Sequence, residues 1–369
     1  MGSAPDPLAF LEEEIASLRH RDLLRTPREH AGVSLCSNDY LGFARLPFED
    51  AHASTLPSGA GASALVTGFH SSHAAAERSL SRWVGVEAAL LFSSGYAANV
   101  GVLSALASAG DLIVSDELNH ASIIDGCRLS RAKVAVYPHC DVRAARQLAS
   151  SRGFRRTFIV TESYFGMDGT RADMAGLREA ADAVGAALIV DEAHALGVVG
   201  AVGDGLCAQA GVRADVLIGT LGKAVGLHGA FAAGSELLRL FLWNRARSFV
   251  FSTATSPAHA AAIPARIARV EAANNAREEI ASLSAGMRRA LGSQAGGTGH
   301  VIPWLLGDPS RALEAQSRLA AMGVVALAIR PPTVPVGSSR VRIAARAGLT
   351  PDEREHAVNA LGRVAASFT

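Results

Sequence analysis

A repeated alternation of short apolar runs with polar or glycine-rich segments most constrains what this chain can fold into. From about residue 77 onwards, the apolar runs recur and helical segments separate many of them. The runs, with the residues that follow them, are AALLF (88–92), DLIVS (111–115), KVAVY (133–137), TFIVTES (157–163), AALIVDEAH (186–194) and DVLIGTLGK (215–223). Apolar runs without polar alternation indicate strands that are buried on both faces of a mostly parallel sheet. The chain is therefore expected to have an α/β fold.

The length of 369 residues exceeds the size at which a single hydrophobic core usually stops growing, so it predicts more than one domain. We expect an N-terminal helix and segment over residues 1–45 and a large α/β domain over 46–260. A linker helix and a small C-terminal α+β domain then cover 261–369. The last helix is expected to begin at the sequence TPDE, with Thr350 as its N-cap and Glu353 completing a capping box.

The composition argues against several classes of protein. The formal net charge is +1 and both signs are mixed along the chain, which predicts no binding to nucleic acid or to a membrane surface. No apolar stretch reaches the ~18 residues of a membrane span, and the acidic, amphipathic N-terminus does not resemble a signal peptide. The four cysteines lie far apart, which argues against a disulfide framework and a metal site. We therefore expect a cytoplasmic protein with reduced thiols at Cys36, Cys127, Cys140 and Cys207.

Polar residues follow several of the predicted strands, at the edge where a parallel sheet binds its ligands. Asp191 and His194 come directly after one strand, in the letters DEAH that nucleic-acid helicases also contain. A helicase needs the phosphate-binding pattern GxxxxGK[ST], which this chain lacks, so that interpretation is disfavoured. A structural interpretation, in which both residues only cap a strand end, remains open at this point.

Lys223 stands in LIGTLGKAVG, residues 217–226, where the other residues are apolar, small or glycine. Lysine is almost never fully buried unless it is paired, so a lysine at an exposed loop tip is one interpretation. The other is an amine kept partly desolvated so that it acts as a nucleophile and forms a Schiff base. A lysine Schiff base beside a carboxylate that pairs with a pyridinium nitrogen is the signature of a pyridoxal-phosphate site. Asp191 is the carboxylate that this interpretation requires.

Further motifs supply what such a cofactor needs. The segment SSGYAAN contains a glycine turn that opens into a helix, with Ser94, Gly95 and Tyr96 available to a phosphate. His120 follows DELN and is placed to stack on a flat ring, although an isolated histidine there more often caps a helix. Glu162 follows another strand in the same sense and is a further candidate cofactor contact.

The motifs SNDYLG, FSSGYAAN, NHAS, VDEAHALG and TLGKAVG resemble those of the α-oxoamine synthases. These are fold-type-I pyridoxal-phosphate enzymes that condense an amino acid with an acyl thioester and release CO2. The resemblance runs from about residue 33 to the C-terminus. It implies an aspartate-aminotransferase-like fold, pyridoxal 5′-phosphate as cofactor and a homodimer. Residues 328–343, AIRPPTVPVGSSRVRI, most resemble the members that join L-alanine to a pimeloyl thioester of coenzyme A or of a carrier protein.

The resemblance also implies roles for individual residues. Lys223 would form the Schiff base with the cofactor and then remove the Cα proton of the amino acid. Asp191 would pair with the pyridine nitrogen, and His194 would approach the 3′-oxygen of the ring. His120 would stack on the ring face. The residues implied at the phosphate are Gly95, Tyr96 and Thr220, with Thr253 reaching across a dimer interface.

On the substrate side, the resemblance implies that Asn38 and Arg342 bind the amino-acid carboxylate and that Arg25 contacts the acyl donor. The loop IRPPTVP is expected to set the choice of acyl donor, because its prolines restrict the backbone around Arg330 and Thr333. An arginine can bind the terminal carboxylate of a pimeloyl chain in a bidentate way, and a plain fatty acyl chain offers no such group. A rigid connector between two strands is the alternative for this loop.

Three positions depart from the family pattern. Gly166 stands before MDG where serine is usual, Asp204 stands in GAVGDG where arginine is usual, and Leu196 follows DEAHA where threonine or glycine is common. Two other functions therefore stay open. One is an α-oxoamine synthase that uses glycine or serine, or a different acyl chain, and the other is a non-catalytic pyridoxal-phosphate-binding paralogue. The intact lysine, aspartate and histidines argue against the paralogue.

Overall fold

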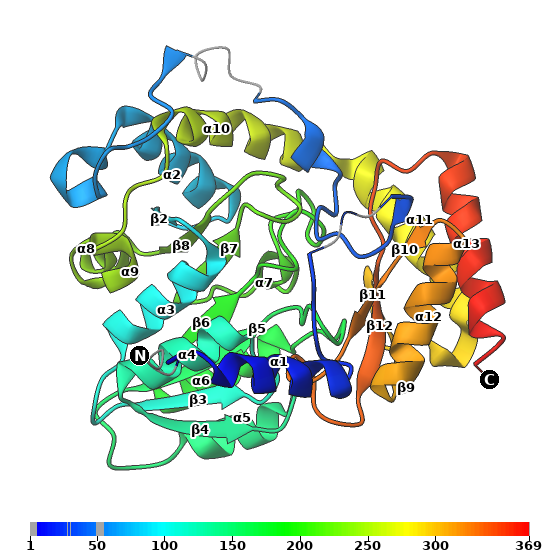
Figure 1. Ribbon diagram of the computed structural model, residues 1–369. Coiled ribbons are helices and arrows are strands. Elements are labelled where there is room, and N and C mark those ends of the chain that lie inside the picture. The colour runs from blue at the N-terminus through cyan, green and yellow to red at the C-terminus, as the bar shows by residue number, and fades with distance from the viewer. Residues whose placement is uncertain (1–5, 28, 30, 49–54, 369) are drawn as a thin grey trace, which may run out of the picture.

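The computed structural model describes residues 6–27, 29, 31–48 and 55–368 (Figure 1). Within these residues the largest sheet has seven strands, in the order β2-β8-β7-β6-β5-β3-β4. Their bounds are Ala88–Phe92 (β2), Leu112–Asp116 (β3), Lys133–Tyr137 (β4), Thr157–Glu162 (β5), Ala187–Asp191 (β6), Val216–Thr220 (β7) and Ala230–Gly234 (β8). Strands β2 to β7 coincide with the apolar runs of the sequence, so the predicted α/β class is confirmed.

The strand directions bring the predicted ligand-binding ends together. Strands β3 to β7 pair in parallel, and β8 is the antiparallel exception. Because β2 pairs antiparallel with β8 and β8 pairs antiparallel with β7, β2 runs in the same direction as β7. The carboxyl ends of β2 to β7 therefore share one edge of the sheet, as expected. The sequence pattern misses β8, because its residues AFAAG are mostly alanine and glycine and give a weak strand signal.

The large sheet is buried on both faces. Leu90 and Phe92 of β2 enter the core on one face, and the alternating Ala89 and Leu91 enter the core on the other. One face is covered by α3 (Gly95–Leu106), α4 (Ala121–Ser130) and α8 (Glu236–Arg245). The opposite face is covered by α2 (Ser71–Trp83), α5 (Val142–Ala149), α6 (Met174–Val184) and α10 (Pro257–Glu271). These layers explain why the strands are continuously apolar in sequence.

A second, antiparallel sheet lies in the C-terminal part of the chain, beside the large sheet in Figure 1. Its strands, in the order β11-β12-β9, are Leu327–Ile329 (β11), Ser339–Ala344 (β12) and Val301–Gly307 (β9). The helices of this part are α11 (Asn274–Leu291), α12 (Pro309–Ala321) and α13 (Pro351–Ala365). Thr350 and Glu353 form the predicted capping box of α13. The domain boundaries at residues 45 and 260 stay predictions.

Several shorter elements complete the fold. The linker helix expected after the large domain is two helices, because α10 ends at Glu271 and α11 begins at Asn274. Strand β1 (Val33–Ser34) pairs in parallel with β10 (Val324–Val325), which ties the N-terminal segment to the C-terminal part. The remaining helices within the described ranges are α7 (Leu206–Gln209), α9 (Arg247–Val250) and the short helical turns Phe43–Arg45, Ala64–Gly68 and Gly292–Gln294.

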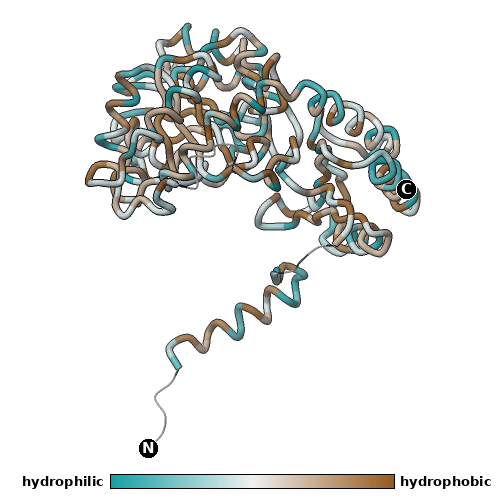
Figure 2. Tube along the Cα trace, turned by 90° about the horizontal axis from the view of Figure 1, so that it is seen from above, coloured by the Kyte–Doolittle hydropathy of each residue, from teal (hydrophilic) through white to brown (hydrophobic). Residues whose placement is uncertain are grey.

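Helix α1, Phe10–His20, contains no buried residue and projects away from the rest of the chain (Figure 2). The apolar side chains of Leu8, Phe10, Leu11 and Ile15 are all exposed in and next to it. A helix of this kind usually covers its apolar side against another surface. Among the described residues, no helix has the length and apolar character needed to span a bilayer.

Candidate active site

Lys223 lies three residues beyond the end of β7, at the shared carboxyl edge of the sheet. Its amine Nζ is 2.8 Å from Nε2 of His194. Burial lowers the pKa of Lys223 to about 8, although the charges of Asp191 and Glu162 oppose this change. A larger share of the amine is therefore neutral near pH 8 than in an ordinary lysine, and neutral amine is the nucleophilic form. The exposed loop-tip interpretation of this lysine does not fit its contacts.

His194 stands between the lysine and a buried tyrosine. Its Nδ1 is 2.7 Å from the hydroxyl of Tyr40, and its Nε2 faces Lys223. Burial, followed by the positive charges of Lys223 and Arg342, holds the pKa of His194 well below its ordinary value. The ring is thus neutral at physiological pH, with both nitrogens oriented by neighbours. A neutral imidazole of this kind can donate to or accept from an oxygen on a bound ring.

Asp191 is the last residue of β6, and its carboxylate is fixed from two sides. Oδ2 accepts a hydrogen bond of 2.7 Å from the side-chain amide of Asn99, and Oδ1 accepts one of 2.8 Å from the peptide N–H of Ala193. Glu162 pairs with Asp191 in the register between β5 and β6. Burial, followed by the charge of Asp191, raises the pKa of Glu162 to about 8, so Glu162 keeps a proton at a higher pH than an ordinary carboxyl does.

His120 caps a helix, which is one of the two interpretations of this residue, and its stacking on a flat ring stays a prediction. It is the N-cap of α4, and its Nδ1 accepts from the peptide N–H of Ser122 at 3.2 Å and lies 2.7 Å from the Ser122 hydroxyl. The Ser122 hydroxyl in turn accepts a 3.0 Å hydrogen bond from Asn99. Asn99 therefore joins the His120 cap to the Asp191 carboxylate. Burial lowers the pKa of His120, and the charge of Lys223 lowers it further, although the charge of Asp191 opposes both. The His120 ring is therefore largely neutral.

The predicted phosphate end lies where α3 begins. Ser94 caps this helix, with its hydroxyl accepting a 3.1 Å hydrogen bond from the N–H of Ala97. A Cβ added to Gly95 would lie 3.8 Å from Cβ of Thr220, so the end of β7 comes directly beside the start of the helix. Helix N-termini with nearby hydroxyls are natural anion sites. Tyr96 is half exposed, and its hydroxyl donates to Asp125 at 2.5 Å.

Arg342, one of the residues predicted to bind substrate, lies on β12 of the C-terminal sheet. Arg342 donates from one terminal nitrogen to Asn38 Oδ1 at 2.9 Å and to the Tyr40 hydroxyl at 3.2 Å. Its Nε donates to the backbone carbonyl of Gly166 at 2.5 Å. Since Tyr40 also contacts His194, the two predicted carboxylate-binding residues lie next to the lysine site.

Not every predicted residue joins this cluster. Arg25 donates to the Thr333 hydroxyl at 3.1 Å and to the carbonyl of Arg330 at 3.5 Å, and these three residues line a separate groove of about 530 Å³. Thr253 is exposed and, together with Phe69, lines another cavity. Lys223, His194 and Asp191 are not among the residues that line this cavity. The structure of one chain therefore assigns these residues to other surfaces.

The departures from the family pattern have different structural settings. A Cβ added to Gly166 would lie 2.1 Å from Nε2 of His194, so the glycine leaves the space that this ring occupies. Leu196 is buried. A Cβ added to Gly219 of β7 would lie 2.5 Å from Cδ1 of Leu196, so the Leu196 side chain packs against strand β7. Asp204 has a buried Oδ1 with no hydrogen-bond partner among the described residues. Only Gly166 touches the site itself.

Three residues that sequence reasoning did not select hold the site in place: Asn99, Tyr40 and Ser122. Asn99 lies four residues after Gly95 on α3, so the helical period carries it back over the strand ends. Tyr40 stands inside the SNDYLG motif, and Ser122 follows His120 in NHAS. The motifs contain the signal, but the partners that these side chains contact come from distant segments.

The donor set fits pyridoxal 5′-phosphate. A desolvated lysine, a fixed buried carboxylate, neutral histidines and a capped helix terminus converge on one edge of the sheet. Asn99 Oδ1 is buried without a hydrogen-bond partner in the described part of the chain, so the Asp191 side of the site has one unused acceptor. Fold and site together define an enzyme of the fold-type-I pyridoxal-phosphate class.

The chain matches the family model of aminotransferase class I and II over residues 31–361. A protein of Alkalilimnicola ehrlichii named 8-amino-7-oxononanoate synthase is 42% identical to it, over 96% of this chain and 97% of that protein. A protein of Anaeromyxobacter dehalogenans with the same name is 46% identical, over 85% and 81% of the two chains. The chain therefore belongs to the class I and II aminotransferase family and, within it, to the 8-amino-7-oxononanoate synthases.

Solved structures agree on the fold. The serine palmitoyltransferase of Sphingomonas wittichii superposes with a TM-score of 0.89 and 26% identity, over 98% of this chain and 99% of that one. The 8-amino-7-oxononanoate synthase of Francisella tularensis superposes with a TM-score of 0.77 and 23% identity, over 91% of this chain and 98% of that one. At that level of identity the second match supports the fold alone.

Proposed function

We propose that this chain condenses L-alanine with a pimeloyl thioester and releases CO2 and the free thiol carrier, giving 8-amino-7-oxononanoate in biotin synthesis. The observation that carries the proposal is the Lys223–His194–Tyr40–Arg342 chain of contacts, which places an amine with a lowered pKa beside an arginine suited to an amino-acid carboxylate. The names of the relatives favour this reaction over a condensation that uses another amino acid or another acyl chain.

Pyridoxal 5′-phosphate, when bound, supplies an electron sink for the carbanion that forms at the alanine Cα. Lys223 would hold the cofactor covalently, and Asp191 would pair with its ring nitrogen. His194 and His120 would orient the ring, and Glu162 is a further contact beside Asp191. Ser94, Gly95, Tyr96 and Thr220 are the residues suited to its phosphate.

The residues of this chain then divide the remaining work. Arg342 and Asn38 bind the alanine carboxylate and orient its Cα–H bond. The Lys223 amine removes the Cα proton, which its lowered pKa allows near neutral pH. The same amine returns a proton to that carbon after CO2 leaves. His194 and Tyr40 hold the lysine and the arginine in one hydrogen-bonded line.

The groove at Arg330 is the proposed site for the far end of the acyl donor. Arg330 is 8% exposed, and its Nε is buried with no hydrogen-bond partner among the described residues. Burial, followed by the charge of Arg25, lowers the pKa of Arg330, and the charge of Asp22, which also lines the groove, opposes them. The positive charges of Arg25 and Arg330 attract an anion. The terminal carboxylate of a pimeloyl chain is such an anion. The adjacent strands β11 and β12 connect this groove to Arg342.

The exposed apolar surfaces support a homodimer. Leu65, Val66, Phe69 and Phe251 are exposed next to the cavity that Thr253 lines, and α1 exposes a second apolar surface. A monomer rarely leaves such surfaces in water. If a second copy covers these surfaces, its residues come close to Thr253. This agrees with the expectation that Thr253 reaches the cofactor phosphate across a dimer interface.

The test is a matrix of amino acids and acyl thioesters assayed by mass spectrometry of the products. Purified protein loaded with pyridoxal phosphate should give 8-amino-7-oxononanoate from L-alanine with pimeloyl-coenzyme A or the pimeloyl carrier protein. Glycine, L-serine and unsubstituted acyl chains should react much more slowly. A preference for one of those substrates would replace the proposal with another α-oxoamine synthase, and no product from any pair would favour the paralogue.

A further inference from the structure

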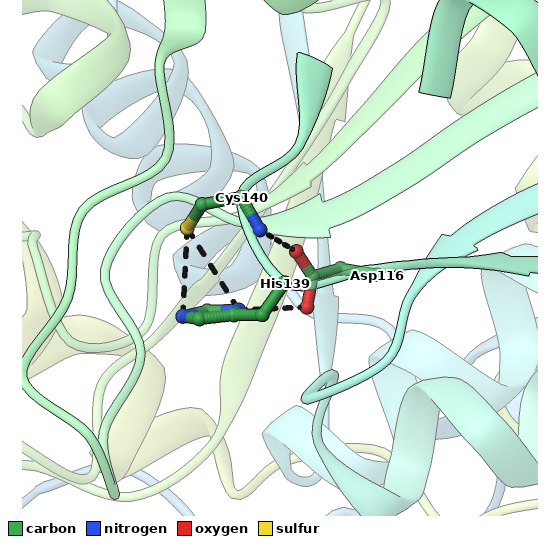
Figure 3. A group of neighbouring side chains, drawn as sticks. All are labelled: Asp116, His139 and Cys140. Carbon is green, nitrogen blue, oxygen red and sulfur yellow. Dashed lines mark hydrogen bonds and ion pairs between the residues drawn. The ribbon is translucent and has the colours of Figure 1, made fainter. Parts of the chain in front are cut away.

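A second cluster of titratable side chains, which the proposed function does not use, contains Asp116, His139 and Cys140 (Figure 3). Asp116 ends β3, and the other two residues follow β4. Nδ1 of His139 lies 2.9 Å from Asp116 Oδ1, and Nε2 lies 2.7 Å from the hydroxyl of Thr170. The peptide N–H of Cys140 donates to Asp116 Oδ2 at 2.8 Å. One carboxylate thus fixes both the histidine ring and the cysteine backbone.

The sulfur of Cys140 is held against the imidazole. Sγ is 3.5 Å from Nε2 and 3.7 Å from Nδ1 of His139. Figure 3 shows Sγ on one face of the ring, outside the ring plane. Cys140 has a φ of +58°, a conformation that residues other than glycine rarely adopt. It is partly exposed, whereas Cys127 and Cys207 are buried.

His139 is positioned to carry a positive charge. Burial alone would lower its pKa, but the hydrogen bond to Asp116 and the contact with Cys140 outweigh burial and raise the pKa to about 10. Reactive cysteines are typically partly exposed and lie beside a cationic side chain, as Cys140 lies beside His139. A metal ion would need a ring lone pair, but both ring nitrogens already face oxygen partners while the sulfur lies off the ring plane. The geometry therefore favours a reactive thiol over a metal site.

We propose that Cys140 is a modification site for small disulfides. Its thiolate attacks one sulfur of the disulfide, a new S–S bond forms to Cys140, and the original S–S bond breaks. The other half leaves as a thiolate that takes a proton from water, so no further oxidant is required. Asp116 and His139 act as positioning residues, because they hold the charge beside the sulfur.

The modification is also connected to the proposed active site. Cys140 Sγ lies 3.6 Å from the carbonyl of Arg171, and Arg171 pairs with Tyr164 to close one loop. Gly166, whose carbonyl accepts from Arg342, stands within that loop. A group attached to the sulfur replaces the thiol hydrogen that faces this carbonyl. We therefore expect it to shift the loop and lower turnover. This consequence rests on the proposed function, whereas the reaction at the thiol does not.

The test exposes the full-length protein to oxidised glutathione and follows each cysteine by peptide mass mapping. Cys140 should form the mixed disulfide about tenfold or more faster than Cys36, the matched, partly exposed control in the same chain. His139→Gln should slow the reaction at Cys140 by about tenfold and leave Cys36 unchanged. Equal rates at the two cysteines, or a zinc ion in the purified protein that protects Cys140, would overturn the proposal. If the variant does not fold, the rate ratio in the unchanged protein decides.

Activity is measured in the same samples. Glutathione should lower turnover, a reducing thiol should restore it, and Cys140→Ser should be active and resistant. Mixed disulfide at Cys140 with turnover unaffected would overturn the connection to the loop. A protein that has no synthase activity before treatment would contradict the proposed function, while the mass map would still test the reactivity of the thiol.

Discussion

The lysine site and the Arg330 groove are built in different ways. At the lysine site, the side chains follow strands of one sheet, and each contacts a partner from another segment. In the groove, Arg25 comes from the N-terminal segment and Arg330 from the residue after β11, and a spare donor remains at Arg330. A site at the carboxyl ends of strands is rigid and suited to one reaction. A groove between an N-terminal segment and a loop can change its selectivity without changing the chemistry.

The largest effect is expected at Lys223. Lys223→Ala should fold, because the residue stands in a loop after β7. Its turnover should fall by at least about 10³-fold, because the variant lacks both the proposed covalent anchor and the proposed base. Steady-state kinetics and a circular dichroism spectrum measure the two properties. Substantial turnover in a folded variant would show that another residue supplies the base.

Asp191→Asn should lower turnover by roughly 10²-fold, because an amide cannot keep a ring nitrogen protonated. Apparent substrate affinity should change much less than turnover. Glu162→Gln is the matched control at the neighbouring strand position, and it should cost less than about tenfold because the raised pKa of Glu162 already favours the neutral carboxyl. A reversed order of the two losses would transfer the ring-nitrogen role to Glu162.

In the groove, Arg330→Ala should narrow the preference for pimeloyl over heptanoyl thioesters by roughly tenfold to a hundredfold. The affinity for alanine should stay nearly constant, because Arg342 is the residue proposed to bind the amino acid. The measurement is kcat/KM for both donors in the two proteins. If the ratio of the donors does not move, the loop is only a rigid connector, and if alanine affinity falls instead, Arg330 serves the amino-acid side.

A smaller effect is expected at Gly166. Gly166→Ser restores the residue usual in the family but places a Cβ where His194 now lies, 2.1 Å from its Nε2. The ring must shift relative to Lys223, and turnover should fall by roughly tenfold or less. A crystal structure of the variant would show the displacement. An increase in turnover with His194 unmoved would mean that the serine hydroxyl is useful here and that the glycine is a loss.

The same comparison explains what the sequence could predict. The strand ends were predictable because apolar runs mark the strands, and the polar residues after them include Lys223, Asp191 and Glu162. The contacts of Asn99 and Tyr40 are not predictable from the sequence, because their partners depend on how α3 and the N-terminal segment pack. The groove required the pairing of Arg25 with Thr333, which no local pattern encodes. Strand β8 was missed because small residues carry little strand signal.

The role of Lys223 is tested most directly by mapping the lysine that binds the cofactor. Purified protein is loaded with pyridoxal phosphate, reduced with borohydride, digested and analysed by mass spectrometry, with Lys133 as a control lysine on β4, away from the cluster of contacts around His194. We expect the reduced cofactor on Lys223 and no label on Lys133. Label on Lys133, with Lys223 unmodified, would contradict the role proposed for Lys223.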